Sequence, residues 1–147
     1  MTSHQVYLGL GSNLGDREGN IRKAIDLLHE RVGEVVRQSS LIETAPWGFE
    51  SEHRFLNGVV LCETTLTPRQ VLKVTKKIER ELGKTEAHAT KRQLSMSNSQ
   101  FPTFKDRPID IDILLYDDWK VEEPDLKIPH PLMRERDFVM IPLKEIL

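Results

Sequence analysis

The ten residues from 107 to 116 constrain the fold of this chain more than any other stretch. They read Arg-Pro-Ile-Asp-Ile-Asp-Ile-Leu-Leu-Tyr, in which apolar and acidic side chains alternate. Because successive side chains of a strand point to opposite faces, the alternation predicts a strand with one face in a core. The side chains expected in that core are Ile109, Ile111, Ile113 and Leu115. Asp110 and Asp112 are expected side by side on the other face.

The two aspartates need an explanation, because Asp is a poor strand former and like charges on one face repel. A cation between them would remove the repulsion, and Mg²⁺ prefers one or two carboxylates together with waters and substrate phosphates. The alternative is a half-exposed strand that carries two acids and binds nothing. Arg107 and the basic stretch before it favour a metal site that faces a phosphate ligand.

The composition is that of a single globular domain. The chain has 147 residues, of which 38% are hydrophobic and 30% charged, enough to bury a core without disulfides. A formal net charge of −2 argues against a nucleic-acid partner. Cys62 is the only cysteine and is expected to be a buried apolar residue. Neither a signal peptide nor an apolar run of about 18 residues is visible, so a cytoplasmic protein without membrane contact is expected.

Hydrophobic periodicity predicts the order strand, helix, strand, strand, helix, strand. The expected strands cover residues 6–10, 34–43, 55–65 and 109–116. Asp16 and Thr67 are the expected N-caps of the helices, and Gly33 and Gly83 the expected ends. A short return strand is expected at 119–121, and residues 138–147 should pack back as strand or helix. This order is typical of a ferredoxin-like βαββαβ domain of the α+β class, with helices on one face of a mostly antiparallel sheet and the other face left for a ligand.

A long basic segment separates the second helix from the last strand. Residues 84–107 hold five Lys or Arg and two acidic residues, a local charge of 5 − 2 = +3, and no convincing periodicity. Loops longer than about 12–15 residues are usually functional or disordered. An insertion without a role is the alternative to a functional loop.

Common nucleotide-binding motifs are missing from the sequence. The run Gly9 to Gly15 fails the dinucleotide pattern because Leu14 stands where glycine is needed, and no P-loop occurs. The histidines lack zinc-site spacing. A bound nucleotide would therefore be held by charge and metal.

Six segments, in chain order, resemble the 6-hydroxymethyl-7,8-dihydropterin pyrophosphokinase family. They are Gly-Ser-Asn-Leu-Gly-Asp-Arg at 11–17, Thr-Ala-Pro-Trp-Gly at 44–48, Phe-Leu-Asn at 55–57, the strand at 107–116, Ile-Pro-His-Pro at 128–131 and Arg-Asp-Phe-Val at 136–139. The resemblance covers nearly the whole chain. It implies a ferredoxin-like domain over residues 1–147 that transfers pyrophosphate from ATP to the hydroxymethyl group of a reduced pterin, releasing AMP, in folate biosynthesis.

The resemblance also assigns roles to residues. Asp110 and Asp112 would bind two Mg²⁺ ions, and Arg107 would assist them at the phosphates. The ATP contacts would be Arg107, His130, Arg136, Ile113 and Lys84. The pterin contacts would be Thr44, Trp47, Phe55, Asn57 and Phe138, with the two phenylalanines stacked on the ring. Such a transfer needs charge neutralisation and positioning rather than a protein nucleophile.

Several of these residues also have ordinary structural interpretations. Phe55 and Phe138 would suit core packing, Asn57 an edge or a bulge, and His130 the capping of a turn. The basic segment departs from the family where Phe104 and its neighbours precede Arg107, so Lys91 or Arg92 would supply positive charge. We expect this loop to be mobile in a monomeric free protein and to close over ATP.

Two other functions fit the same order of elements. An RNA-binding module would share it, but the stretch Phe55–Val60 lacks the aromatic motif of such modules, and the net charge is negative. A regulatory domain that binds a small ligand without chemistry would leave the paired aspartates unexplained. Metal-dependent ATP binding separates the enzyme from both.

Overall fold

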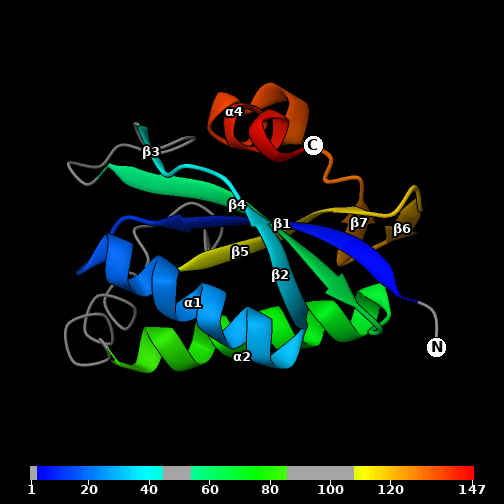
Figure 1. The fold of residues 1–147 in the computed structure, drawn as a ribbon, viewed down its shortest axis with the longest axis horizontal. Helices are drawn as coiled ribbons and strands as arrows, with labels where there is room; N and C mark the ends of the chain where they lie inside the picture. Colours follow the sequence, from blue (N-terminus) through cyan, green and yellow to red (C-terminus); the bar gives the residue numbers. More distant parts are fainter. Residues whose placement is uncertain (1–2, 45–53, 86–107) are drawn as a thin grey trace.

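An antiparallel sheet forms the centre of the computed structural model, which describes residues 3–44, 54–85 and 108–147, without the side chains of 84 and 85. Its strands are β1 (His4–Ser12), β2 (Gly33–Gln38), β4 (Phe55–Thr64) and β5 (Asp110–Tyr116), in the order β2-β4-β1-β5, and β3 (Ile42–Thr44) pairs with β4. The helices α1 (Arg17–Arg31) and α2 (Pro68–Thr85) connect β1 to β2 and β4 to β5 (Figure 1). The expected α+β arrangement of ferredoxin-like type is confirmed.

The helix starts follow from local sequence. Asp16 accepts a hydrogen bond from the Gly19 N–H at 3.1 Å and caps α1. At the start of α2, the Thr67 N–H donates to Gln70 Oε1 at 2.9 Å and the Gln70 N–H donates to Thr67 Oγ1 at 3.2 Å, which is a capping box. The predicted end at Gly83 is wrong, because α2 continues to Thr85. Gly15 is the glycine with a positive φ, 68°, among the described residues, so Gly83 keeps a helical backbone.

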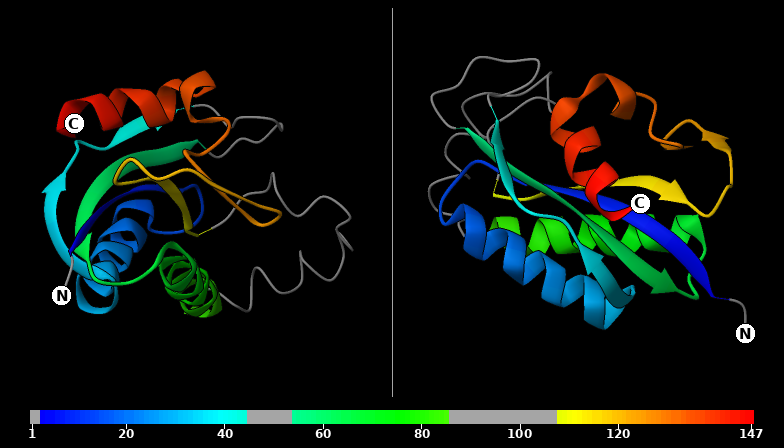
Figure 2. Two further views of the ribbon diagram at one scale, coloured as in Figure 1. Left: turned by 90° about the vertical axis from the view of Figure 1, so that its right-hand side faces the viewer. Right: turned by 45° about the horizontal axis from the view of Figure 1, so that its top comes forward.

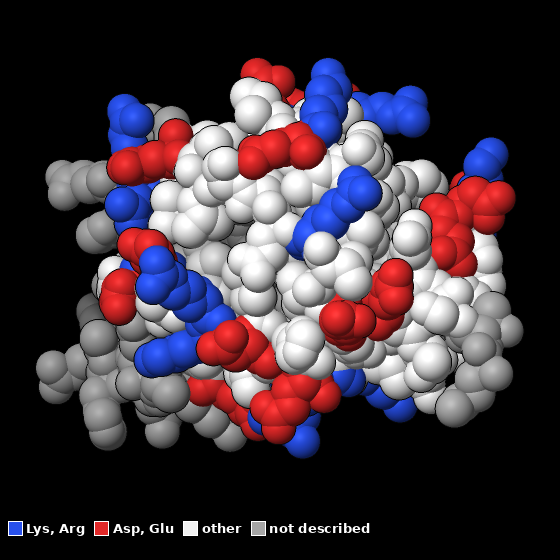
Figure 3. All heavy atoms as spheres, in the orientation of Figure 1, with Lys and Arg blue, Asp and Glu red and all other residues white. Residues whose placement is uncertain are grey.

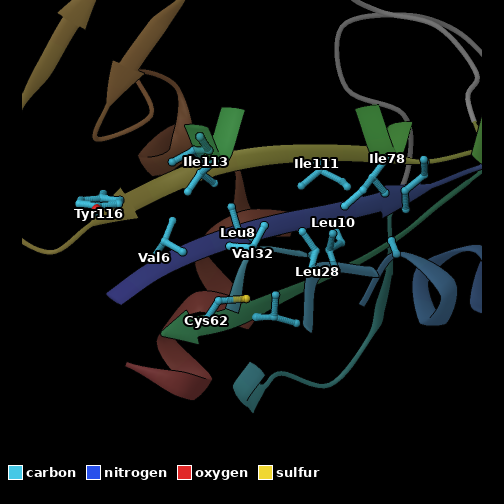
Figure 4. Close-up of a cluster of buried hydrophobic side chains, with 14 of the residues drawn as sticks. Val6, Leu8, Leu10, Leu28, Val32, Cys62, Ile78, Ile111, Ile113 and Tyr116 are labelled. Atoms are coloured by element: carbon cyan, nitrogen blue, oxygen red, sulfur yellow. The ribbon is translucent and has the colours of Figure 1, made fainter. Parts of the chain in front are cut away.

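The sheet separates two apolar clusters. On one face, α1 and α2 cover the larger cluster, which includes Val6, Leu8, Leu10, Ile111, Ile113 and Tyr116 (Figure 4). On the other face, α4 (Asp137–Ile146) covers a smaller cluster that includes Val59, Leu61, Leu114, Val139 and Leu143 (Figures 1 and 2). The expectation that this second face stays open for a ligand is therefore wrong over the part that α4 covers.

A bulge interrupts the alternation of β5. Tyr7 of β1 lies opposite Leu115, whereas the next residue, Leu8, lies opposite Ile113, so Leu114 is an extra residue. Leu114 is buried in the α4-side cluster, and Leu115 packs against that cluster as well. The prediction that Leu115 shares a core with Ile113 is wrong for this reason.

The remaining differences lie at the sheet edge and in the C-terminal third. The expected strand at 34–43 is two strands, β2 and β3, because the Ser39 hydroxyl takes the place of a backbone partner and accepts from the Val59 N–H at 2.8 Å. In place of the expected return strand at 119–121, a hairpin of β6 (Val121–Glu123) and β7 (Leu126–Ile128) begins two residues later, at Val121. Residues 137–146 form a helix, one of the two expected outcomes. Within the described ranges no helix is long and apolar enough to cross a bilayer.

Candidate functional site

A row of three residues runs across the α4-side face of the sheet. Gly11 of β1 lies opposite Asp110 of β5 on one side and opposite Asn57 of β4 on the other. Residues directly opposite in antiparallel strands project to the same face, so Asp110 and Asn57 flank a gap above the glycine. Asp112 occupies the next row, opposite Gly9. Both aspartates are half-buried and lie on the face expected from the sequence.

The glycine at the middle of the row makes room for its neighbours. A Cβ atom at Gly11 would lie 3.0 Å from Asn57 Oδ1 and 3.4 Å from the Phe55 ring. The Asn57 amide donates to Thr44 Oγ1 at 2.8 Å, which links β3 to β4. The structure therefore brings Thr44, Phe55 and Asn57 together, three of the residues assigned to the pterin.

A histidine approaches Asp110 from the segment that precedes α4. Burial lowers the pKa of His130, and the nearby Arg136 charge lowers it further, whereas Asp110 acts in the opposite direction. His130 thus lies within electrostatic reach of both Arg136 and Asp110. The His130 Nδ1 also accepts from the Leu132 N–H at 3.2 Å, so the expected turn cap is present too. The Arg136 guanidinium lies 5.6 Å from the centre of the Phe138 ring, a cation–π arrangement.

Phe138 and Ile113 are both placed by the apolar clusters. Phe138 is half-buried and packs against the α4-side cluster, which agrees with its ordinary interpretation as a packing residue. The Ile113 side chain is 5% exposed and lies in the larger cluster on the other face. An ATP contact at Ile113 would therefore use its main chain.

A carboxylate that the sequence analysis missed lies beside the aspartates. Glu79 of α2 accepts a hydrogen bond from the Ile111 N–H at 2.8 Å, and Lys76 Nζ lies 3.4 Å from its other oxygen. Burial and the neighbouring Asp110 charge raise the pKa of Glu79 to about 7. The sequence signal that could have indicated Glu79 is its position directly after Ile78, a buried residue in the apolar stripe of α2.

Four predicted features lie outside what the structure describes. Trp47 and Arg107 fall outside the described residues, as does the loop expected to close over ATP, and the side chain of Lys84 is not described.

The donor set fits magnesium better than a transition metal. Among the described residues, no three His, Cys, Asp or Glu side chains come together as a metal cluster. Asp110 and Asp112 alone offer two carboxylates on one face, and Mg²⁺ commonly completes such a set with waters and substrate phosphates. The arrangement can thus hold a cation and present it to an anionic ligand, beside the aromatic ring of Phe55 and the amide of Asn57.

Comparisons with known proteins agree with this chemistry. Residues 7–147 match the family model described as 7,8-dihydro-6-hydroxymethylpterin-pyrophosphokinase. A 2-amino-4-hydroxy-6-hydroxymethyldihydropteridine pyrophosphokinase of Porphyromonas gingivalis is 47% identical over 142 residues, covering 96% of this chain and 89% of that protein. The corresponding proteins of Aquifex aeolicus and Bacillus subtilis are 43% and 41% identical, each covering 96% of this chain, and 79% and 77% of their own lengths.

Solved structures support the fold. A structure described as HPPK-DHPS in complex with substrates has a TM-score of 0.72 at 14% identity and covers 99% of this chain, which spans 40% of that chain. The wild-type HPPK-DHPS of Plasmodium falciparum has a TM-score of 0.68 at 16% identity, covering 98% of this chain and 41% of its own. Since the family model matches nearly the entire sequence and the relatives reach 41–47% identity, this chain belongs to the 7,8-dihydro-6-hydroxymethylpterin-pyrophosphokinase family.

Proposed function

We propose that the protein transfers pyrophosphate from ATP to the hydroxymethyl group of 6-hydroxymethyl-7,8-dihydropterin at the face that carries Asp110, Asp112 and Asn57. As a family member it is an ATP-dependent pyrophosphokinase of folate biosynthesis. The observation that carries the site is the row Asp110–Gly11–Asn57. Adjacent strands lie about 4.8 Å apart, so the outer two backbones are about 10 Å apart, a span suited to a bicyclic ring with its hydroxymethyl arm.

Asp110 and Asp112 would hold Mg²⁺, with two ions as the expected number. When bound, magnesium neutralises phosphate charge and lowers the pKa of a bound hydroxyl. The carboxylates fix this charge at one end of the row, opposite Asn57. No protein nucleophile is needed, because positioning and charge supply the catalysis.

The pterin end of the site is built from β3 and β4. The Asn57 amide is held by Thr44, and its Oδ1 lies above Gly11, where it can accept from N–H groups on the edge of the heterocycle. Phe55 offers a ring beside the same glycine, and we assign the opposite face of the pterin to Phe138. Trp47 is proposed to complete this pocket.

The ATP end is assigned to nitrogen-bearing side chains and to main chain on the aspartate side of the row. His130 lies within electrostatic reach of Asp110 and of Arg136, and we propose that His130 and Arg136 bind the phosphates or the ribose. Arg107, Lys84 and the main chain of Ile113 are proposed as further ATP contacts. We also propose that residues 1–147 act as one monomeric domain in the cytoplasm, where ATP is available, without nucleic-acid or membrane partners. On the face shown in Figure 3, Lys or Arg and Asp or Glu side chains are interspersed, unlike the basic patch that nucleic-acid binders use.

The test is AMP release from Mg-ATP with and without 6-hydroxymethyl-7,8-dihydropterin, for the parent and for Asp110→Asn and Asp112→Asn. We expect pterin-dependent AMP formation that falls by on the order of a hundredfold or more in each variant, because each loses a metal-binding charge. Unfolding curves serve as the control for folding. Full activity in either variant would contradict the assignment of that aspartate, and no AMP from a folded parent would contradict the proposed reaction at this site.

A further inference from the structure

Glu79 contacts the main chain of β5 between the two aspartates. Its carboxylate accepts from the Ile111 N–H at 2.8 Å, and Ile111 is the single residue that separates Asp110 from Asp112. The Glu79 side chain is 17% exposed, so water covers little of it. A helix side chain therefore holds the backbone at the centre of the proposed metal site.

The contact closes an edge of the sheet. In the strand order β2-β4-β1-β5, β5 is an outer strand, and its other edge is already paired with β1. Edge strands present unpaired N–H groups that need another partner. At Ile111 that partner is α2, which contacts β5 along this stretch. The hydrogen bond thus adds a contact from α2 to the pairing of this segment with β1.

We propose that Glu79 is a positioning residue, whose hydrogen bond to the Ile111 main chain sets the spacing and direction of Asp110 and Asp112 for divalent-cation binding. The inference rests on the proposed function for the identity of the metal site. Glu79 is not itself assigned as a ligand, because the described residues contain no cluster of three such groups.

The acceptor oxygen, rather than the negative charge, carries this role. The Asp110 charge opposes ionisation of Glu79, so a second carboxylate here repels the first. A carboxyl group accepts the Ile111 hydrogen bond in either protonation state. Glutamine keeps an acceptor of the same reach, whereas methionine keeps the volume and loses the acceptor.

The test compares Glu79→Gln and Glu79→Met with the parent and with Glu81→Met. Glu81 is a matched control, since it lies on the same helix and pairs with Arg31 of α1. Nitrogen-15-labelled proteins are titrated with MgCl₂ alone and followed at the amides of Asp110 and Asp112. Hydrogen exchange of the Ile111 amide is measured on the same samples, so that neither readout requires turnover.

We expect Glu79→Met to exchange the Ile111 amide about tenfold faster and to need about tenfold more Mg²⁺, because the Ile111 N–H loses its acceptor. Its kcat for AMP formation should fall while the KM for the pterin stays unchanged. Glu79→Gln and Glu81→Met should match the parent in both readouts.

Three outcomes would overturn the inference: an impaired Glu79→Gln, an unchanged Mg²⁺ midpoint in Glu79→Met despite faster exchange, or an impaired Glu81→Met. If Glu79→Met does not fold, the test rests on Glu79→Gln. Parental Ile111 exchange and parental Mg²⁺ binding in that variant would support the inference, and impairment of either would contradict it. A parent that forms no AMP would refute the proposed function, while the MgCl₂ titration would still decide the role of Glu79.

Discussion

Replacing Gly11 with alanine is expected to damage the pterin end of the site, whereas the same change at Gly9 is expected to be harmless. Both glycines lie in β1 on the same face of the sheet, two residues apart. A Cβ at Gly11 would lie 3.0 Å from Asn57 Oδ1 and 3.4 Å from the Phe55 ring. A Cβ at Gly9 would meet the Leu114 side chain at 3.5 Å, which is an ordinary contact.

The size of the effect follows from these contacts. At Gly11 the amide of Asn57 must move by a few tenths of an ångström, against its 2.8 Å hydrogen bond with Thr44. Overpacking of this kind costs about 1–3 kcal/mol, while the lower chain entropy of alanine returns about 0.4–1 kcal/mol. Gly11→Ala should therefore lose about 1 kcal/mol of unfolding free energy, and Gly9→Ala should gain about 0.5 kcal/mol.

Two assays check the pair. Urea unfolding gives the free energies, and titration with 6-hydroxymethyl-7,8-dihydropterin gives the Kd, which should rise about fivefold to tenfold for Gly11→Ala because a displaced amide loses about one hydrogen bond. The Kd for Mg-ATP should not change in either variant. Equal stability and equal pterin affinity in the two variants would refute the reasoning, since it depends on the 0.5 Å difference between 3.0 and 3.5 Å.

Three further predictions concern buried polar groups. Tyr116→Phe removes an O–H that donates to the Leu66 carbonyl at 2.6 Å. The variant should therefore lower the free energy of unfolding by about 1–2 kcal/mol, and an unchanged urea midpoint would contradict this. The Glu79 pKa of about 7, against 4.5 ordinarily, means that the folded protein binds this proton more tightly than the unfolded chain. Parent stability should therefore decline relative to Glu79→Gln, by up to about 3 kcal/mol, as pH rises from about 4.5 to about 7 in metal-free buffer; a pH-independent difference would show that the shift is absent. Burial raises the pKa of the Cys62 thiol to about 12, so iodoacetamide at about pH 8 should label only unfolded protein, and rapid labelling of the native protein would contradict this.

Local pattern was sufficient for most of the fold. The alternation around Asp110 and Asp112 indicates a strand with both acids on one face, because the period of two needs no knowledge of the neighbours. The capping box at Thr67 is likewise a local signal, and the structure contains it. Phe55 and Asn57 share a face for the same reason as the aspartates.

Contacts between distant segments were not accessible in the same way. The juxtaposition of Gly11 with Asn57 and Asp110 depends on the strand order, which local pattern does not encode. Glu79 reaches Ile111 only because α2 lies along the outer edge of β5. The apolar residues of α4 suit a strand or a helix equally well, so its cover of the second face had to come from the structure.

The bulge at Leu114 means that β5 is aligned with β1 in two independent pieces. The first piece sets Asp110 and Asp112 against Gly11 and Gly9, and the second sets Leu115 against Tyr7. An insertion or deletion after residue 113 would thus shift the second piece while the carboxylates stay in place. Sequence alignments of this strand should allow a one-residue gap at Leu114. Strict alternation of faces, counted back from Tyr116, would place Asp110 and Asp112 on the wrong face of the sheet.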